Sequence, residues 1–273
     1  MKELLAGEFP GAYVAFVGLL GLLVGSFLNV CIYRIPRDIS VVRPRSFCPG
    51  CDNPIRAFDN IPLLSYLLLR GKCRHCCVSI SIQYPLIEVT TAILFGTIGA
   101  RYGVTGATFK WLLFESILTV LFWIDLEERI LPDELTLGGT VAGLVCALFV
   151  KLPGLLTDLL VPGWPVTGQS MLNSAAGGTL LAGSIWLLGF IYLRFRKREG
   201  IGFGDVKLLA LLGTFLGIEA GIQALLIGAV SGTVIGLGFI LITRKDASTH
   251  ELPFGSFLCL GGAILPLLIT PGK

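Results

Sequence analysis

Long apolar runs are the feature that most constrains what this chain can fold into. Stretches of about 18 or more residues with few or no charges recur along all 273 residues, and each is typical of a membrane-spanning helix. Hydrophobic residues make up 54% of the chain and charged residues only 14%, whereas about a quarter of a soluble domain is charged. Too little polar surface remains to cover a soluble core of this size. The pattern excludes a soluble enzyme, a disordered chain and a one-helix anchored domain, and it predicts an all-α polytopic membrane protein.

The segments between charges predict about eight transmembrane helices. They cover residues 11–33, 82–100, 105–123, 135–150, 170–193, 206–218, 221–243 and 254–269. The sixth is short, at roughly 20 Å for a rise of 1.5 Å per residue, so we expect its ends to be recessed. The first run is long enough to span, and it lacks a basic stretch of its own and a clear small-residue cleavage site. We therefore interpret it as a helix and not as a cleaved signal peptide.

Lysine and arginine counts choose between the two possible orientations, because cytoplasmic loops carry an excess of both residues. If the segment after the first helix is cytoplasmic, sixteen basic residues lie in cytoplasmic segments and five lie outside. The reverse orientation would put the sixteen on the wrong side. The sequence therefore predicts that both termini lie outside the cytoplasm.

Residues 34–81 form the only polar segment long enough to fold by itself, and they contain two C-x-x-C pairs with 21 residues between them. This spacing is typical of a tetrahedral zinc site, because each pair supplies two thiolates. Reducing conditions in the cytoplasm disfavour disulfides, and a domain of about 45 residues needs a metal or a similar staple. The alternative is four free or disulfide-linked cysteines. The predicted ligands are Cys48, Cys51, Cys73 and Cys76.

Two aspartates stand at helix ends on the predicted cytoplasmic side. Asp125 continues an apolar run, and Asp205 follows the Gly-x-Gly of residues 202–204. Two carboxylates brought within about 3 Å cannot both ionise, so one keeps a proton. Such a pair can deprotonate a water and protonate a leaving amine, which is the chemistry of aspartyl proteolysis. Taken singly, Asp125 could be an interfacial helix-end residue and Asp205 a helix N-cap. For Asp133, a third candidate, the preceding proline favours capping.

A series of motifs in order resembles the type IV prepilin peptidases, which are bifunctional leader peptidases and N-methyltransferases of pilus and type II secretion systems. The motifs are GSFLNV at 25–30, YRIP at 33–36, CPGC at 48–51, NIP at 60–62, SYL at 65–67, RGKC at 70–73, YPLIE at 84–88, DL at 125–126, LPD at 131–133, LT at 135–136, GFGD at 202–205, KL at 207–208 and PFG at 253–255. One departure is Ser256, where a second proline is more usual. It bears only on the start of the last helix.

The resemblance implies catalytic roles for Asp125 and Asp205. It implies that prepilins or pseudopilins are cut after a glycine that follows a short basic leader, at the inner membrane surface. The new N-terminal residue, usually phenylalanine, is then methylated from S-adenosylmethionine. The sequence shows no dinucleotide-type fingerprint, so the cofactor site must be of another kind. The resemblance places that site with the polar zinc-binding segment of residues 34–81, the island. Gly71 and Glu88 are the candidate cofactor-binding residues. Glu88 could instead be a charge satisfied by polar groups of another helix.

These expectations give three parts: a first transmembrane helix at 1–33, a cytoplasmic zinc-binding domain associated with methyl transfer at 34–81, and a seven-helix aspartyl protease domain at 82–273. The implied partners are prepilin or pseudopilin substrates and membrane lipid, not nucleic acid, and the oligomeric state is not predicted. We also hypothesise that the acidic cluster of Glu127, Glu128, Asp133 and Glu134 attracts the basic leader.

Three alternatives remain open. A presenilin-like aspartyl protease without methyl transfer would leave the zinc island unexplained. A proton-coupled transporter using the two aspartates predicts inverted repeats, and no convincing internal repeat is visible. A membrane-anchored zinc scaffold without catalysis would leave the aspartate pair unexplained.

Overall fold

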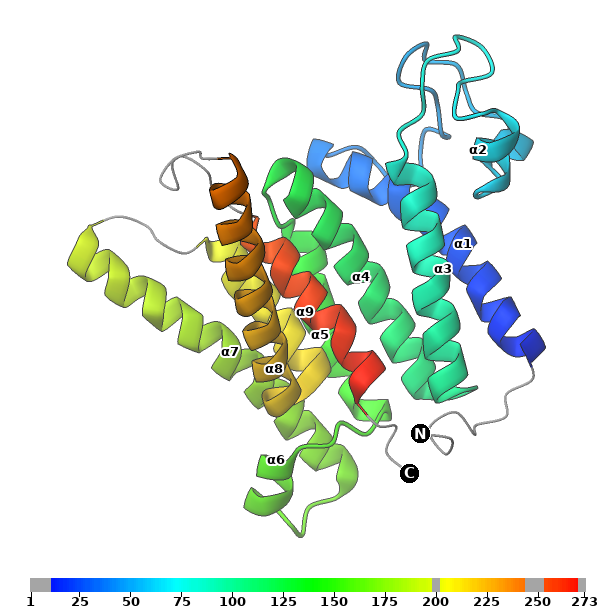
Figure 1. The fold of residues 1–273 in the computed structure, drawn as a ribbon. Helices are drawn as coiled ribbons and strands as arrows, with labels where there is room; N and C mark the ends of the chain where they lie inside the picture. The colour runs from blue at the N-terminus through cyan, green and yellow to red at the C-terminus, as the bar shows by residue number, and fades with distance from the viewer. Residues whose placement is uncertain (1–10, 198–201, 244–252, 270–273) are drawn as a thin grey trace. The chain divides into compact units, whose positions relative to one another are not determined.

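The computed structural model describes residues 11–197, 202–243 and 253–269 (Figure 1). Its long helices are α1 (Gly11–Arg34), α3 (Gln83–Tyr102), α4 (Gly106–Glu128), α5 (Asp133–Phe149), α7 (Val166–Arg196), α8 (Phe203–Thr243) and α9 (Phe254–Leu268). Short helical segments are η1 (Ile35–Arg37), η2 (Ala57–Asn60), α2 (Leu64–Leu68) and α6 (Leu155–Leu160).

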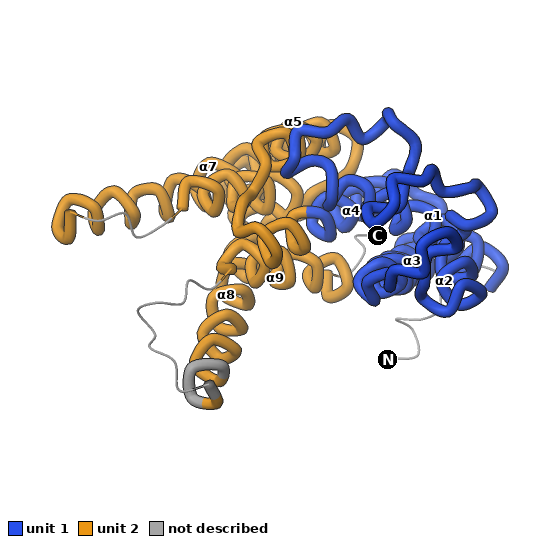
Figure 2. The backbone as a smooth tube through the Cα atoms, turned by 90° about the horizontal axis from the view of Figure 1, so that it is seen from above, with its two compact units in different colours: residues 1–120 blue, residues 121–273 orange. Residues whose placement is uncertain are grey.

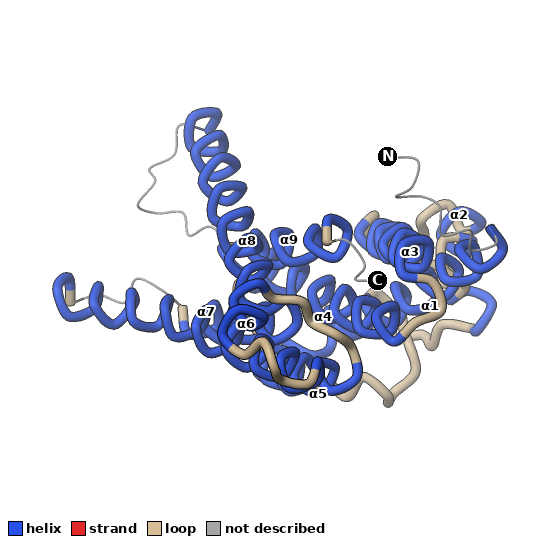
Figure 3. The backbone as a smooth tube through the Cα atoms, turned by 90° about the horizontal axis from the view of Figure 1, so that it is seen from below, coloured by secondary structure: helices blue, strands red, loops and turns tan. Residues whose placement is uncertain are grey.

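Contacts divide the chain into two compact units, residues 1–120 and residues 121–273 (Figure 2). In the part of the chain that the structure describes, each unit is built from helices and loops (Figure 3), and β-pairing is limited to two isolated bridges in the first unit. The predicted all-α class is confirmed. The sequence predicted three parts, which were divided by their expected functions, whereas the two units are divided by contacts between residues. The three-part division stays a prediction.

Each of the eight expected helices has a helical counterpart in the described residues. The expected sixth and seventh helices lie in one element, α8, which is broken at Gly217. Four of the described helices are long and apolar enough to cross a membrane: residues 11–37, 106–128, 166–196 and 203–238. The helix of residues 254–268 is apolar but shorter. Five residues of the orientation count lie outside the described residues, namely Lys2, Arg198, Arg244, Lys245 and Lys273.

In the first unit α1 packs closely against α3. A Cβ added at Gly21 would lie 2.7 Å from the Cα of Ala92, and one at Gly25 would lie 2.8 Å from the Cα of Glu88. Small residues four apart let two helix backbones approach in this way, which is common between membrane helices. The two contacts run in opposite directions along the two helices, so the pair is antiparallel and brings Glu88 to the end of α1 that leads into residues 34–81.

In the second unit α8 is central and packs against α5, α7 and α9. Its break at Gly217 has φ 79°, a conformation that favours glycine. The buried side chain of Asn173 satisfies the break, because its Oδ1 accepts a hydrogen bond from the N–H of Ile218 at 3.0 Å. Its Nδ2 donates to the carbonyl oxygen of Pro153, also at 3.0 Å. The irregular backbone is therefore hydrogen-bonded internally, as a helix interruption in an apolar setting requires.

Candidate functional site

The two C-x-x-C pairs lie in two small hairpins that repeat each other at an offset of 25 residues. The bridge between Phe47 and Pro54 closes the first hairpin, and the bridge between Lys72 and Ser79 closes the second. The N–H of Cys48 donates to the carbonyl of Asn53 at 3.0 Å, and the N–H of Cys73 donates to that of Val78 at 2.9 Å. The residue after each second cysteine is left-handed, with φ 53° at Asp52 and φ 57° at Cys77. Equivalent turns therefore present equivalent pairs of thiols.

The four predicted ligands converge in the first unit. The sulfur atoms of Cys48, Cys51, Cys73 and Cys76 all lie within 4.8 Å of one another. Those of Cys48 and Cys76 are 3.8 Å apart, which matches the separation of about 3.8 Å expected for a tetrahedron with zinc–sulfur bonds of about 2.3 Å. Backbone N–H groups of Cys76 and His75 lower the pKa of Cys73 to about 6, whereas burial raises the pKa of Cys48, so the metal assignment depends on the sulfur geometry. The cluster therefore fits a divalent metal of the zinc type.

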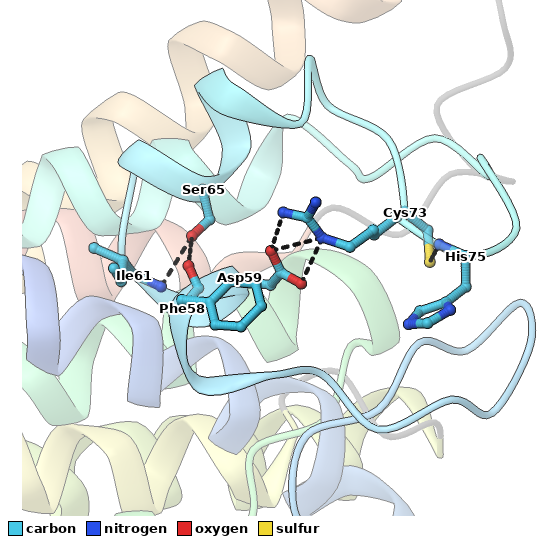
Figure 4. Close-up of polar contacts among 7 residues, drawn as sticks. Phe58, Asp59, Ile61, Ser65, Cys73 and His75 are labelled. Atoms are coloured by element: carbon cyan, nitrogen blue, oxygen red, sulfur yellow. Dashed lines mark hydrogen bonds and ion pairs between the residues drawn. The ribbon is translucent and has the colours of Figure 1, made fainter.

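Side-chain contacts join the second hairpin to the turn before α2 (Figure 4). Arg74 forms a bidentate pair with Asp59, with the shortest N–O distance at 2.6 Å. This hydrogen bonding to Arg74 lowers the pKa of Asp59. Ser65 donates to the carbonyl of Phe58 at 2.9 Å and accepts from the N–H of Ile61 at 3.1 Å. The metal-ligand hairpin and the segment of residues 57–68 thus hold each other in place.

Glu88 is buried on α3, and its carboxylate reaches the island. Its Oε2 accepts a hydrogen bond from the N–H of Leu63 at 2.7 Å. Leu63 has φ 59° and ψ −49°, and the N–H of Leu64 donates to the carbonyl of Pro62. These values describe a γ-turn of the rare, strained kind with positive φ. A strained backbone of this kind persists only where its surroundings enforce it, and such positions cluster at functional sites.

A cavity of about 370 Å³, the first cavity, lies between the island and the adjoining ends of α1 and α3 in the first unit. This volume is in the range of small-molecule sites, about 300–1,000 Å³. Carboxylates of Glu88 and Asp59 and aromatic rings of Tyr66 and Tyr84 line it. Gly71 is not among the lining residues. It has φ 66°, and an added Cβ would meet the Tyr66 hydroxyl at 3.0 Å, so glycine lets this ring pack at the cavity.

Asp125 lies in the last turns of α4 and is buried. The N–H and the hydroxyl of Ser256, at the start of α9, both donate to its Oδ2, at 2.5 and 2.7 Å. The carboxylate rests on Gly255, where a Cβ would lie 3.0 Å from the Asp125 Cγ. The motif at the start of α9 therefore holds the first aspartate.

Asp205 is the third residue of α8, in its first turn, so it does not take the N-cap position, and it is half-buried. Lys207 pairs with Asp133 at 2.6 Å, which ties the start of α8 to the start of α5. Asp133 is the first residue of α5, as its preceding proline suggests. Both predicted catalytic residues lie in the second unit, Asp125 near the end of α4 and Asp205 at the start of α8.

Two contributors to these sites could not be recognised from the sequence. Ser256 stood out only as a departure from a motif, and nothing indicated that it contacts Asp125. Arg34 ends an apolar run and gave no sign that it is buried, yet its guanidinium donates to the carbonyls of Ser40, Pro44 and Arg45.

The described residues define an α-helical membrane protein with a four-cysteine cluster in one unit and two aspartates at helix ends in the other. Residues 19–102 match the family described as Bacterial Peptidase A24 N-terminal domain, and residues 112–237 match the Type IV leader peptidase family. The chain belongs to the type IV leader peptidase family, which confirms the resemblance seen in the motifs.

Similar proteins match over most of their length. A prepilin leader peptidase/N-methyltransferase of Aeromonas salmonicida is 35% identical, over 95% of this chain and 92% of the relative. One of Neisseria gonorrhoeae is 36% identical over 92% of this chain and 89% of its own length. One of Myxococcus xanthus is 38% identical over 90% of this chain and 69% of its own length. No solved structure gives a significant match.

Proposed function

We propose that this protein is a prepilin leader peptidase and N-methyltransferase. Relatives with that name match nearly the whole chain, and Asp125 and Asp205 lie in one unit, near the end of α4 and at the start of α8. The match of residues 112–237, which include both aspartates, to the Type IV leader peptidase family is the observation on which the peptidase assignment depends. We assign the methyl-transfer activity to the first cavity, which Cys48 and Cys73 of the four-cysteine cluster help to line.

The peptidase reaction needs one proton shared between Asp125 and Asp205. The ionised carboxylate removes a proton from a water as the water oxygen bonds to the scissile carbonyl carbon. The protonated carboxylate gives its proton to the carbonyl oxygen, which yields a gem-diol. The other carboxyl then passes the proton that it took from the water to the leaving amine as the carbon–nitrogen bond breaks, and a gem-diol hydroxyl returns its proton to the first carboxylate. Ser256 keeps one oxygen of Asp125 fixed throughout, which leaves the other oxygen for this chemistry.

The substrate class suits an active site at a helix end. A prepilin is an apolar helix with a polar leader on its cytoplasmic side, so its scissile bond lies at headgroup depth. Peptide bonds inside a membrane helix are shielded, because their polar groups are hydrogen-bonded within the helix. A bond at the end of the helix is cut without much unwinding.

Zinc is the metal we assign to Cys48, Cys51, Cys73 and Cys76. It would link the two hairpins and supply the folding energy that a small polar domain lacks. All four ligands are thiolates, which close a tetrahedral site and leave no position for a reacting water. The metal is therefore structural, and the island 34–81 serves the neighbouring first cavity.

S-adenosylmethionine, which supplies a methyl group on a positively charged sulfur, is the cofactor we assign to the first cavity. Arg34, Arg56 and Arg74 line this cavity together with Asp59 and Glu88. Arg74 is paired with Asp59, and Arg34 donates to loop carbonyls, so Glu88 is the carboxylate that we assign to the cation. Bound there, the cofactor would supply a methyl group to the free amine of a cut pilin, and Glu88 with the rings of Tyr66 and Tyr84 would line its site. Gly71 would act on this site through Tyr66, whose ring packs against it.

Eight membrane spans, with the zinc-binding domain cytoplasmic and both termini outside the cytoplasm, complete the proposal. It is supported by the basic residues after α1 and by the names of the relatives, and it places the protein in the bacterial inner membrane. Under this topology both proposed sites face the cytoplasm, where a prepilin leader would be.

The test is incubation of the purified protein with a prepilin, comparing wild type with Asp125→Asn and Asp205→Asn. We expect both variants to lose leader cleavage and to keep methylation of a precut pilin. Cleavage retained by either variant would remove that aspartate from the mechanism. A wild type that cuts but never methylates would favour the aspartyl protease without methyl transfer.

A further inference from the structure

A second cavity, of about 410 Å³, lies against the first along α1. It belongs wholly to the first unit. Six residues line both cavities, which therefore share a wall: Ser26, Val30, Arg34, Ser46, Ile55 and Asn60. A bound group on one side of this wall is close to a bound group on the other.

One side of the second cavity is an outward-facing, apolar side of α1. Leu23 and Phe27 line the cavity and are 61% and 51% exposed. The opposite side comes from the island, which contributes Val42, Ala57 and Pro62. The second cavity therefore stands where a lipid-exposed helix surface meets the polar domain.

Arg34 lines this cavity and holds the loop that forms part of its wall. Its buried guanidinium donates to the carbonyl oxygens of Ser40 and Pro44, at 2.8 and 2.9 Å, and so fixes the loop that lines the cavity. The charged residues that line the second cavity are Arg34 and Arg45, and none of its described lining residues is acidic. A basic group is therefore disfavoured there, whereas an apolar one is not.

We propose that the second cavity binds the apolar N-terminal side chain of a cleaved pilin, with the α-amine at the wall beside Ser26 and Asn60. The proposal rests on the methyl-transfer function proposed above. Methylation requires the amine and the methyl donor to lie side by side, and two cavities with a shared wall provide that arrangement. The apolar helix that follows the amine then lies along the exposed side of α1.

The charges of the second cavity also favour the cut pilin over the uncut prepilin. An uncut prepilin carries a basic leader where the cut pilin has its amine, and two arginines repel such a leader. The cavity therefore accepts the product of cleavage and rejects the precursor.

The test is binding of a short apolar peptide that begins with phenylalanine and carries a fluorophore at its C-terminus, without cofactor, to the full-length protein in detergent. Phe27→Ala should raise its Kd about fivefold or more, because an apolar wall is lost. Ala57→Trp, which fills the cavity from the island side, should raise it likewise. Phe16→Ala is the matched control. Phe16 is 65% exposed, lies three helical turns from Phe27 on the same face and lines neither cavity.

The same variants should raise KM for methylation of the precut peptide and leave leader cleavage unchanged. A peptide that begins with lysine should bind wild type more weakly than the phenylalanine peptide does. Wild-type Kd in both Phe27→Ala and Ala57→Trp, with zinc content retained, would overturn the proposal, as would an equal loss in Phe16→Ala. A wild type that binds the peptide and never methylates it would overturn the proposed methyl transfer instead.

Discussion

Ser256 donates two hydrogen bonds to one carboxylate oxygen of Asp125, from its backbone N–H at 2.5 Å and from its hydroxyl at 2.7 Å. The hydroxyl oxygen also lies 3.1 Å from the carbonyl oxygen of Phe122, one turn earlier on α4. The start of α9 is thereby joined to the end of α4 at the proposed catalytic group. Ser256 is a positioning residue in this arrangement, because it holds Asp125 and need not touch the substrate.

Replacement of Ser256 by alanine should lower kcat for leader cleavage about tenfold, since a hydrogen bond to a charged group contributes about 1.5–3 kcal/mol and the backbone N–H remains. KM should not change. Ser256→Thr keeps a hydroxyl and should restore most of the rate, and methylation of a precut pilin should be the same in all three proteins. Steady-state cleavage of a purified prepilin measures these constants. Wild-type kcat in Ser256→Ala would show that the hydroxyl does not position Asp125.

The sequence predicted the position of this motif but not its contact. The last helix was expected at 254–269 and α9 covers Phe254–Leu268, so the unusual Ser256 does not disturb its start. A helix start follows from local apolar pattern and from the preceding proline, whereas the contact between Ser256 and Asp125 joins residues 131 positions apart. No local pattern carries that information.

Adjacent cysteines offer a sharp test of the metal site. The sulfur of Cys76 belongs to the four-thiolate cluster, whereas Cys77 is exposed and is not part of it. Cys76→Ser should therefore lose bound zinc and destabilise the island, and Cys77→Ser should keep one zinc per chain. Metal analysis of the purified variants, with chelator-induced unfolding of the wild type, checks both outcomes. Equal zinc content in the two variants would contradict the assignment of ligands.

The four thiolates were predictable because each C-x-x-C pair is local and only one further contact is needed to close the site. The first cavity was not predictable, because it depends on how the island meets α1 and α3. Glu88 shows the difference. Its position in an apolar run marked it as unusual. Its hydrogen bond from the N–H of Leu63 depends on a strained turn, which no local residue pattern predicts. The break at Gly217 is similar, since its support comes from Asn173 on another helix.

The acidic residues after Asp125 should assist binding of the leader. Asp133 is paired with Lys207, and the two acidic residues nearest to Asp125 in the sequence are Glu127 and Glu128 at the end of α4. Glu127→Gln with Glu128→Gln should raise KM for a basic leader a few-fold at low salt, because less negative charge attracts it, and the effect should fade at high salt. KM for methylation of a precut pilin, which has no leader, serves as the control. An unchanged KM for cleavage at low salt would refute electrostatic attraction.

Two glycines of α7 differ in whether they pack against another helix, so they distinguish the effect of close helix packing from the effect of glycine on helix stability. A Cβ at Gly177 would lie 2.5 Å from the carbonyl oxygen of Gly213 on α8, whereas one at Gly183 would meet nothing within 4 Å. Gly177→Ala should destabilise the protein by about 1–3 kcal/mol, because the two backbones must move apart. Gly183→Ala should be neutral or stabilising by up to about 1 kcal/mol, because alanine favours the helix. Thermal unfolding of both variants in one detergent compares them, and equal melting temperatures would mean that α7 and α8 do not pack through Gly177. Because α8 carries Asp205 at its start, we also expect Gly177→Ala to lower leader cleavage at temperatures where the Gly183 variant remains fully active.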